Sequence, residues 1–168
     1  MIRRYCRKYA ALPFLLVLLL VAACGPSGGF HHDYASGHYA SDITQCALYA
    51  RDASGVDLYG DAGSWWYKAA GRYRRGHVPE KGSVLVLKGS SRMPHGHVAV
   101  VKNVVDRRSI DVTHSNWGHS SKSRHIIYDS MRVLDISPNN DWTSVRLWND
   151  EQNVFGFPYA AYGFIYPN

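Results

Sequence analysis

The later part of the chain is a series of short apolar segments with a period of two, and this pattern restricts the fold more than any other feature. These segments are rich in Val, Ile, Tyr, Phe and Trp, and they follow a turn signal at residues 79–82. Closely spaced strands without helices between them pair most simply as antiparallel neighbours. The expected strands are residues 83–87, 97–105, 109–116, 125–128, 132–136, 145–148 and 162–166.

Two segments with helical spacing come before the strands. Residues 42–51 offer Asp42 or Thr44 as an N-cap, and residues 62–73 carry two adjacent tryptophans. Helices followed by a run of strands predict an α+β domain, with N-terminal helices packed on a mostly antiparallel sheet. The expected core consists of Val84, Val86, Val98, Val100, Val112, Ile126 and Val133, with Trp65, Trp66, Trp148 and Phe164 as large fillers.

The first residues have the organisation of an export signal. Four basic residues precede an apolar run at residues 10–23, which is shorter than the roughly 20 residues that cross a membrane as a helix. Ala22 and Ala23 directly precede Cys24, and this arrangement resembles the bacterial lipobox. The resemblance implies that residues 1–23 are removed as a signal peptide and that Cys24 is acylated as a lipid anchor. Ordinary cleavage with an incidental cysteine is the alternative.

The anchor and the charge balance bear on location and partners. Because Gly25 rather than Asp follows Cys24, the resemblance favours a lipoprotein of the outer membrane that faces the periplasm, with the inner membrane as the alternative. The chain has 19 Lys and Arg against 13 Asp and Glu, but four of the basic residues lie within residues 1–23, so 15 basic residues remain against 13 acidic ones. No basic stripe interleaved with aromatic residues is present, which argues against nucleic acid as a partner.

The remaining chain divides into a linker and one domain. Residues 24–38 form a lipidated N-terminus rich in Gly and Ser without apolar periodicity, as is typical of a flexible tether. Residues 39–168 are long enough for one domain with a single core.

Cys46 is the one thiol of the mature domain, because the other two cysteines belong to the export segment or become its anchor. A lone thiol in an exported protein is exposed to oxidation, which favours a chemical use for it. At the start of a helix, the partial positive charge of the helix N-terminus favours the thiolate. The sequence therefore predicts a nucleophile, against the alternative of a small buried core residue.

A base and an orienting group follow on two neighbouring strands. His97 begins an apolar strand, and the next strand places His114 and Asn116 on a common face by alternation. The two strands form a hairpin, so His97 can hydrogen bond to His114 or to Asn116 if the register permits. A zinc site built from His95, His97 and His114 is the alternative, but no acidic fourth ligand accompanies them, so no metal and no cofactor are expected.

Taken together, these motifs resemble the CHAP domain, the cysteine, histidine-dependent amidohydrolase/peptidase. The resemblance runs in order from about residue 41 to residue 117. It is carried by Gln45-Cys46 with Tyr49, Ala50 and Arg51, by Asp61-Ala62 and Trp65-Trp66, by residues 79–84 (PEKGSV), by residues 96–101 (GHVAVV), and by Asn116-Trp117.

The resemblance implies a papain-like fold of the NlpC/CHAP type and cleavage of an amide bond in peptidoglycan. That bond is either the one between N-acetylmuramic acid and L-alanine or one within the stem peptide and its crossbridge. Cys46 is then the nucleophile and His97 the general base. Many CHAP domains carry a glutamate where this chain has His114; the related NlpC-type peptidases use a histidine as third residue, so the orienting group is His114 or Asn116.

The mechanism expected from these residues is acyl transfer through a thioester on Cys46. The negative oxygen would be held by the Cys46 backbone N–H and a second donor, for which Gln45 is a candidate. The expected partners are peptidoglycan and, through the lipid, a membrane; a protein activator is not identified by the sequence. A catalytically silent lipoprotein that binds or regulates at the cell wall is the competing hypothesis.

Overall fold

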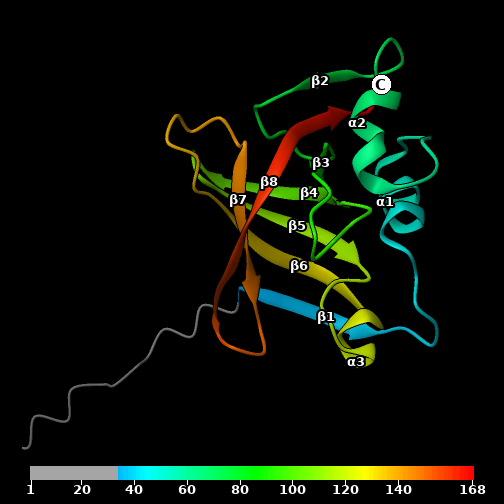
Figure 1. The fold of residues 1–168 in the computed structure, drawn as a ribbon, viewed down its shortest axis with the longest axis vertical. Helices are drawn as coiled ribbons and strands as arrows, with labels where there is room; N and C mark the ends of the chain where they lie inside the picture. The colour runs from blue at the N-terminus through cyan, green and yellow to red at the C-terminus, as the bar shows by residue number, and fades with distance from the viewer. Residues whose placement is uncertain (1–33) are drawn as a thin grey trace, which may run out of the picture. The chain divides into compact units, whose positions relative to one another are not determined.

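The structure is a computed structural model that describes residues 34–168, and strands make up most of it (Figure 1). The predicted signal peptide, the predicted lipobox and most of the predicted tether lie outside the described residues. No helix among the described residues is long and apolar enough to cross a membrane. The elements in chain order are β1 (Ala35–Tyr39), α1 (Cys46–Ser54), the 3-10 turn η1 (Ala62–Ser64), α2 (Trp65–Lys68), β2 (Arg74–Gly76), β3 (Val84–Leu87), β4 (His97–Asp106), β5 (Ser109–Ser115), α3 (Ser121–Arg124), β6 (Ile126–Asp135), β7 (Ser144–Asn149) and β8 (Val154–Tyr166).

Six strands close into an antiparallel barrel in the order β6, β5, β4, β3, β8 and β7, with β7 pairing back to β6. Closure depends on the length of β8, whose first half pairs with β7 and whose second half pairs with β3. β1 and β2 extend the sheet outside the barrel, next to β6 and β8 respectively. A closed barrel leaves few unpaired strand edges, which removes the need for helices to cover them.

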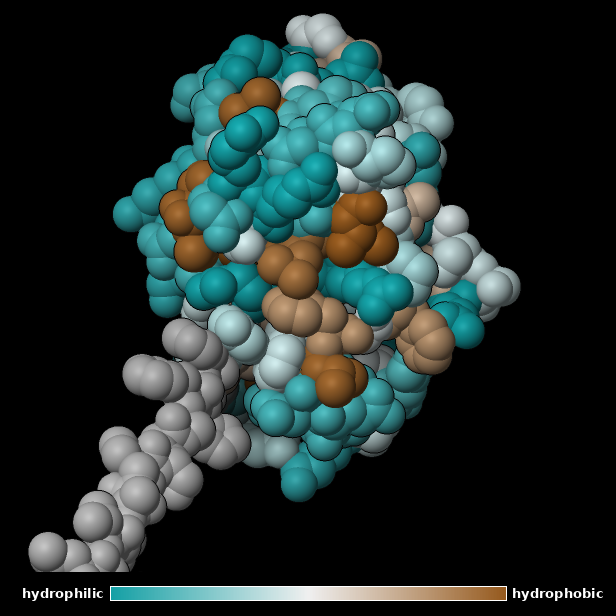
Figure 2. Space-filling model, turned by 90° about the vertical axis from the view of Figure 1, so that its left-hand side faces the viewer, coloured by the Kyte–Doolittle hydropathy of each residue, from teal (hydrophilic) through white to brown (hydrophobic). Residues whose placement is uncertain are grey.

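The central strands are buried on both faces, so alternation sorts their apolar residues into two clusters. One face of β3, β4, β5 and β6 fills the barrel interior with Leu85, Leu87, Ala99, Val101, Ile110, Val112, Met131 and Val133. The other face packs against α1 and α2 through Val84, Val86, Val98 and Val100, which contact Ala50 and Trp65. The apolar run of β3 is buried at every position for this reason. Figure 2 shows that hydrophobic residues on the pictured face are set among hydrophilic ones.

The predicted helices differ most from the structure. Apart from short helical turns, the described chain has one helix of nine residues, α1, and the predicted helix at residues 62–73 is reduced to η1 and the four-residue α2. The strands pair antiparallel as expected, but the expectation of N-terminal helices packed on this sheet is wrong: the described residues begin with a strand, and six strands close into a barrel. Gly71 adopts a positive φ shortly after α2, which a continuing helix does not allow.

The N-terminal boundary of the domain also lies earlier than predicted. Residues 35–38, assigned by composition to the tether, belong to β1, which pairs with β6. Only Ala35 of this strand is buried, so its sequence lacks the apolar alternation that predicts a strand. Gly37 lies so close to the carbonyl oxygen of Ile127 that a Cβ atom would be 2.6 Å from it. Backbone pairing rather than side-chain burial holds this strand.

Gly96 fixes the approach to β4 and therefore the start of the strand that carries His97. Its φ is +69°, and a Cβ atom there would lie 2.6 Å from the carbonyl oxygen of Leu87 and 2.7 Å from the nitrogen of Gly63. Both neighbours are backbone atoms that cannot move aside without distorting β3 or η1.

We predict that Gly96→Ala destabilises the domain more than Gly82→Ala, which is its matched control. Gly82 has a similar φ of +85° but nothing within 4 Å of the added methyl group, so it reports the cost of backbone conformation alone. That cost is about 1 kcal/mol, and overpacking at Gly96 adds roughly 1–3 kcal/mol. Free energies of unfolding from denaturant titration measure the difference; equal losses would contradict the crowding argument.

Candidate active site

Cys46 is the first residue of α1, and two hydrogen bonds hold this helix start against β5. The Oγ of Ser115 donates to the backbone oxygen of Thr44 over 2.7 Å, and the hydroxyl of Tyr49 lies 2.6 Å from the Oγ1 of Thr113. Gln45 is the N-cap residue, with extended backbone and no capping bond from its side chain. The helix starts later than residue 42, and this later start places the thiol in the first turn.

The electrostatics of Cys46 differ from the expectation of a stabilised thiolate. Burial raises the pKa of the Cys46 thiol, while hydrogen bonds from the backbone of Val98, Ala47 and Cys46 itself act in the opposite direction. The burial effect is the larger, so the thiol is protonated in the resting state. It needs a base to become a nucleophile. The contact with Val98 also places the sulfur beside the residue that follows His97.

His97 and His114 form a buried pair on neighbouring strands. The Nε2 atom of His97 lies 2.9 Å from the Nδ1 atom of His114. Val100 pairs with Thr113, and continuing this register places His114 on the diagonal from His97, a neighbour within reach of a long side chain. Trp117 packs on both rings at centroid distances of 4.8 and 5.6 Å, and Tyr128 stacks on His114 at 5.2 Å.

Met131 determines which nitrogen of each ring carries the proton. Its Sδ atom lies 3.3 Å from the Nε2 of His114, and a thioether sulfur accepts hydrogen bonds but cannot donate them. We therefore infer that His114 carries its proton on Nε2 and accepts at Nδ1, and that His97 donates from Nε2. The unprotonated nitrogen of His97 is then Nδ1, which forms no hydrogen bond within residues 34–168 and is the atom available to take a proton.

Burial keeps both imidazoles neutral. It lowers the pKa of His97 to about 3. It also lowers the pKa of His114 well below its usual value, and a positive charge on His97 would lower it further. At neutral pH, His97 is therefore a neutral imidazole and Cys46 a protonated thiol, which are the protonation states from which general-base activation starts.

Asn116 and Gln45 contact each other rather than His97. Asn116 has a φ of +54°, so the strand alternation that places His114 and Asn116 on one face stops at Ser115. Its Nδ2 atom donates to the Oε1 of Gln45 over 2.7 Å, and its Oδ1 atom accepts from the Nε of Arg124 over 2.8 Å. Of the two predicted orienting groups, His114 is the one that the structure places against His97.

The structure offers no support for the zinc alternative. His95 is exposed, and its Nδ1 atom lies 3.1 Å from a carboxylate oxygen of Asp61, whereas His97 is buried. In the described part of the chain, no group of three or more His, Cys, Asp or Glu residues could hold a metal ion.

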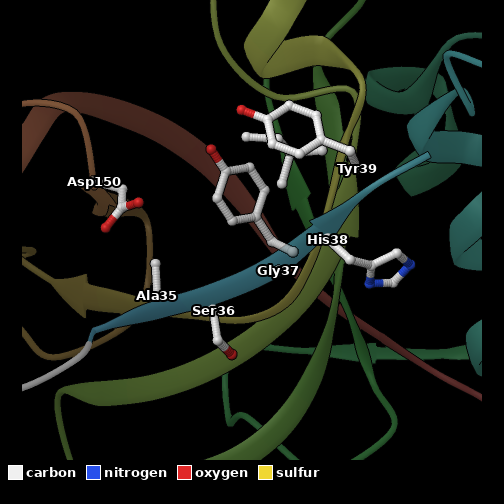
Figure 3. A pocket seen from close by; sticks show the side chains of 8 residues that line it. Ala35, Ser36, Gly37, His38, Tyr39 and Asp150 are labelled. Atoms are coloured by element: carbon white, nitrogen blue, oxygen red, sulfur yellow. The ribbon is translucent and has the colours of Figure 1, made fainter. Parts of the chain in front are cut away.

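A separate pocket lies beside β1. It is lined by residues of β1 together with Ile126, Tyr128 and Asp150 (Figure 3). Neither Cys46 nor His97 contributes to its lining, so this pocket is not the place where the thiol would meet a substrate.

Sequence reasoning did not identify Met131, Tyr128 or Arg124 as parts of the site. Met131 pairs with Val112 and Tyr128 with His114, and the register shifts between these two pairs. A strand partner cannot be deduced from period-two alternation when such an irregularity intervenes. Arg124 belongs to α3, a four-residue helix too short for a periodic pattern.

A comparison with protein-family models agrees with the family resemblance. Residues 34–116 match the model of the CHAP domain, a segment that contains Cys46, His97, His114 and Asn116. A solved structure of N-acetylmuramoyl-L-alanine amidase from Staphylococcus aureus is similar at 21% sequence identity and a TM-score of 0.43. That similarity covers 70% of this chain but only 30% of the amidase chain. A comparison with curated protein sequences finds no match.

The neutral histidine pair predicts that the domain loses stability in mild acid. A histidine whose pKa is lowered by folding contributes its full stability above the pKa of the unfolded chain, about 6.5, and loses it as the pH falls toward the folded value. Between pH 6.5 and 5, we expect His97 to account for a loss of about 2 kcal/mol, and the lowered pKa of His114 acts in the same direction. Carboxylates whose pKa values are lowered by folding reduce the stability of the domain only at pH values below this range.

Denaturant titrations at pH 7.5, 6.5, 5.5 and 5.0 measure this loss. His119→Gln is the matched control, because His119 is exposed and its removal should leave the acid loss unchanged. A free energy of unfolding that is constant between pH 7.5 and 5 would contradict the assignment of neutral, desolvated rings.

Proposed function

We propose that this chain is a cysteine hydrolase of the CHAP type that cleaves an amide bond of peptidoglycan. One observation carries the proposal: within a segment that matches the CHAP domain, the Cys46 thiol lies against the backbone next to His97, whose Nε2 bonds to His114. These contacts support Cys46 as the nucleophile, His97 as the base and His114 as the orienting group of an acyl transfer.

The reaction starts with proton transfer from the Cys46 thiol to Nδ1 of His97 as the sulfur attacks the amide carbonyl. His97 becomes an imidazolium, and its Nε2–H donates to His114, which keeps the ring aligned. The imidazolium then gives its proton to the leaving amine, the C–N bond breaks, and a thioester remains on Cys46. A water molecule, deprotonated by His97, attacks the thioester and releases the carboxylic acid and the thiol.

The substrate bond is either the N-acetylmuramoyl-L-alanine amide or a peptide bond of the stem or crossbridge. The two alternatives give different products, because the first separates intact peptides from glycan strands and the second leaves part of the peptide on the sugar. Masses of the fragments released from purified peptidoglycan distinguish them.

The location that we propose follows from the N-terminal segment. Acylation of Cys24 would hold the hydrolase on a membrane, and the absence of Asp at residue 25 supports the outer membrane facing the periplasm. Anchoring would confine a hydrolytic activity to wall within reach of the tether.

Cys46→Ser should abolish peptidoglycan hydrolysis while the domain stays folded. The hydroxyl is nearly isosteric with the thiol, but a neutral imidazole does not ionise it to a comparable extent, so the rate should fall by several orders of magnitude, roughly 10⁴-fold or more. Release of soluble fragments is measured beside His119→Gln as a folded control. Activity of the serine variant within tenfold of the parent would remove Cys46 from the mechanism.

His114→Ala should lower hydrolysis by about 100-fold, because His97 loses the group that fixes its tautomer and orientation. Asn116→Ala should cost distinctly less, because no hydrogen bond joins Asn116 to His97 within residues 34–168. Turnover of both variants, after thermal unfolding has verified that they fold, gives the ranking. A larger loss in Asn116→Ala would transfer the orienting role to it.

Cys24→Ala should release the protein into soluble fractions or leave the signal peptide attached. Among residues 34–168, no helix is long and apolar enough to cross a membrane. Fractionation of cells followed by immunoblotting tests this. A processed variant that still sediments with membranes would show either that the lipobox interpretation is wrong or that a protein partner retains the chain.

A further inference from the structure

A chain of polar side chains leads to Gln45, the residue directly before the nucleophile. Arg124 donates from Nε to the Oδ1 of Asn116 over 2.8 Å, and Asn116 donates from Nδ2 to the Oε1 of Gln45 over 2.7 Å. The three residues come from the end of α3, the residue after β5, and the N-cap of α1. We call this set the amide relay.

Arg124 sets the direction of every hydrogen bond in the amide relay. A guanidinium has only donors, so the amide oxygen of Asn116 must face it. The NH₂ group of Asn116 is then turned toward Gln45. Gln45 accepts this hydrogen bond with its amide oxygen, Oε1. The NH₂ group of Gln45 consequently points away from Asn116, and within residues 34–168 no hydrogen bond engages it.

The backbone around the amide relay is adapted to this arrangement. Asn116 adopts a left-handed conformation, with φ of +54°, that asparagine tolerates better than most residues, and it directs the side chain toward α1. α3 is closed at its start by reciprocal capping bonds between Ser120 and Ser123, which hold Arg124 at the other end of the turn.

We propose that Asn116 and Arg124 are positioning residues that hold the NH₂ group of Gln45 toward the negative oxygen formed when Cys46 attacks the substrate. The proposal rests on the proposed hydrolase function. Gln45 is exposed and its amide could otherwise present either end to the substrate. A donor whose direction is set before the reaction needs no reorganisation at the transition state, and one such donor contributes about 10²–10³ in kcat. Asn116 then acts through Gln45 and not through His97.

A double-mutant cycle tests the route of action. With a soluble muropeptide as substrate and the purified mature chain as enzyme, we expect kcat to fall about 100-fold in Gln45→Ala and about 10-fold in Asn116→Ala, with KM changed little. If Asn116 works through Gln45, the double variant is no slower than Gln45→Ala. Losses that multiply to about 1,000-fold would show an independent role for Asn116 and overturn the proposal.

A reversal of hydrogen-bond direction gives a sharper test than truncation. Asn116→Asp conserves shape and still satisfies Arg124, but a carboxylate only accepts, so Gln45 must turn its NH₂ group toward it and its oxygen toward the substrate. We therefore expect Asn116→Asp to lose about 100-fold in kcat, more than Asn116→Ala. Arg124→Lys, which also only donates, should stay closer to the parent than Arg124→Gln. An aspartate variant at least as active as the alanine variant contradicts the amide relay.

Alkylation of Cys46 by iodoacetamide separates this role from damage to the nucleophile or its base. The sulfur displaces iodide from a saturated carbon, so no negative oxygen forms and Gln45 has nothing to stabilise. The alkylation rate and its pH profile should match the parent in Gln45→Ala and Asn116→Asp. A changed rate or profile in either would mean that these residues act through Cys46 or His97, against the proposal.

The failure of the proposed function is recognisable separately. A parent chain that is alkylated at Cys46 but cleaves no muropeptide refutes the hydrolase, and ¹⁵N spectra of the side-chain amides then test the amide relay by itself. Arg124→Gln should shift the NH₂ signals of both Asn116 and Gln45. An unchanged Gln45 signal would overturn the relay.

Discussion

The hydrogen bond between His97 and His114 is the interaction on which the rest of the site depends. It joins two fully desolvated rings, so neither can hold a charge at neutral pH without losing much of its solvation. The sulfur of Met131 at the far end sets the tautomer of both. Because this sulfur only accepts hydrogen bonds, the unprotonated nitrogen of His97 is Nδ1.

The closed barrel explains why this pair can be buried at all. β4, β5 and β6 contribute His97, His114 and Met131 in turn, and closure through β7 and β8 encloses them beside an apolar interior. Cys46 approaches from the other face, where α1 packs on β4. Polar bonds from β5 to the start of α1 fix the distance between the two layers. Trp117 packs on both rings and Tyr128 stacks on His114, and the burial of His97 lowers its pKa.

Much of the sheet could be predicted from the sequence because its strands bury strictly alternating or continuous apolar residues. Val84, Val98, Val112 and Val133 are all buried as expected. β1 could not be predicted, since backbone pairing holds it. Trp142 also escaped prediction: it lies in a turn-rich segment, with φ of +59°, and is nonetheless buried against Phe164. Burial of a loop residue depends on closure of the barrel, which no local pattern encodes.

In the site, too, features set by the local sequence could be predicted, whereas features set by distant segments could not. Residue type and strand position pointed to Cys46, His97 and His114, but the direction of each proton depends on partners from distant segments, Met131 and Arg124. The pKa of Cys46 is a further example. The helix N-terminus is a local feature and favours the thiolate, whereas burial is set by the packing of α1 on β4 and has the larger effect.

Ring ¹⁵N NMR of the histidines distinguishes these protonation states, because protonated and unprotonated ring nitrogens have well-separated shifts. At pH 7, we expect His97 and His114 both to be neutral, each with its proton on Nε2 and an unprotonated Nδ1, and we expect His97 to stay neutral well below pH 6. An imidazolium at His97, or a proton on its Nδ1, would rule out His97 as the base, because that nitrogen could then not take the proton of Cys46.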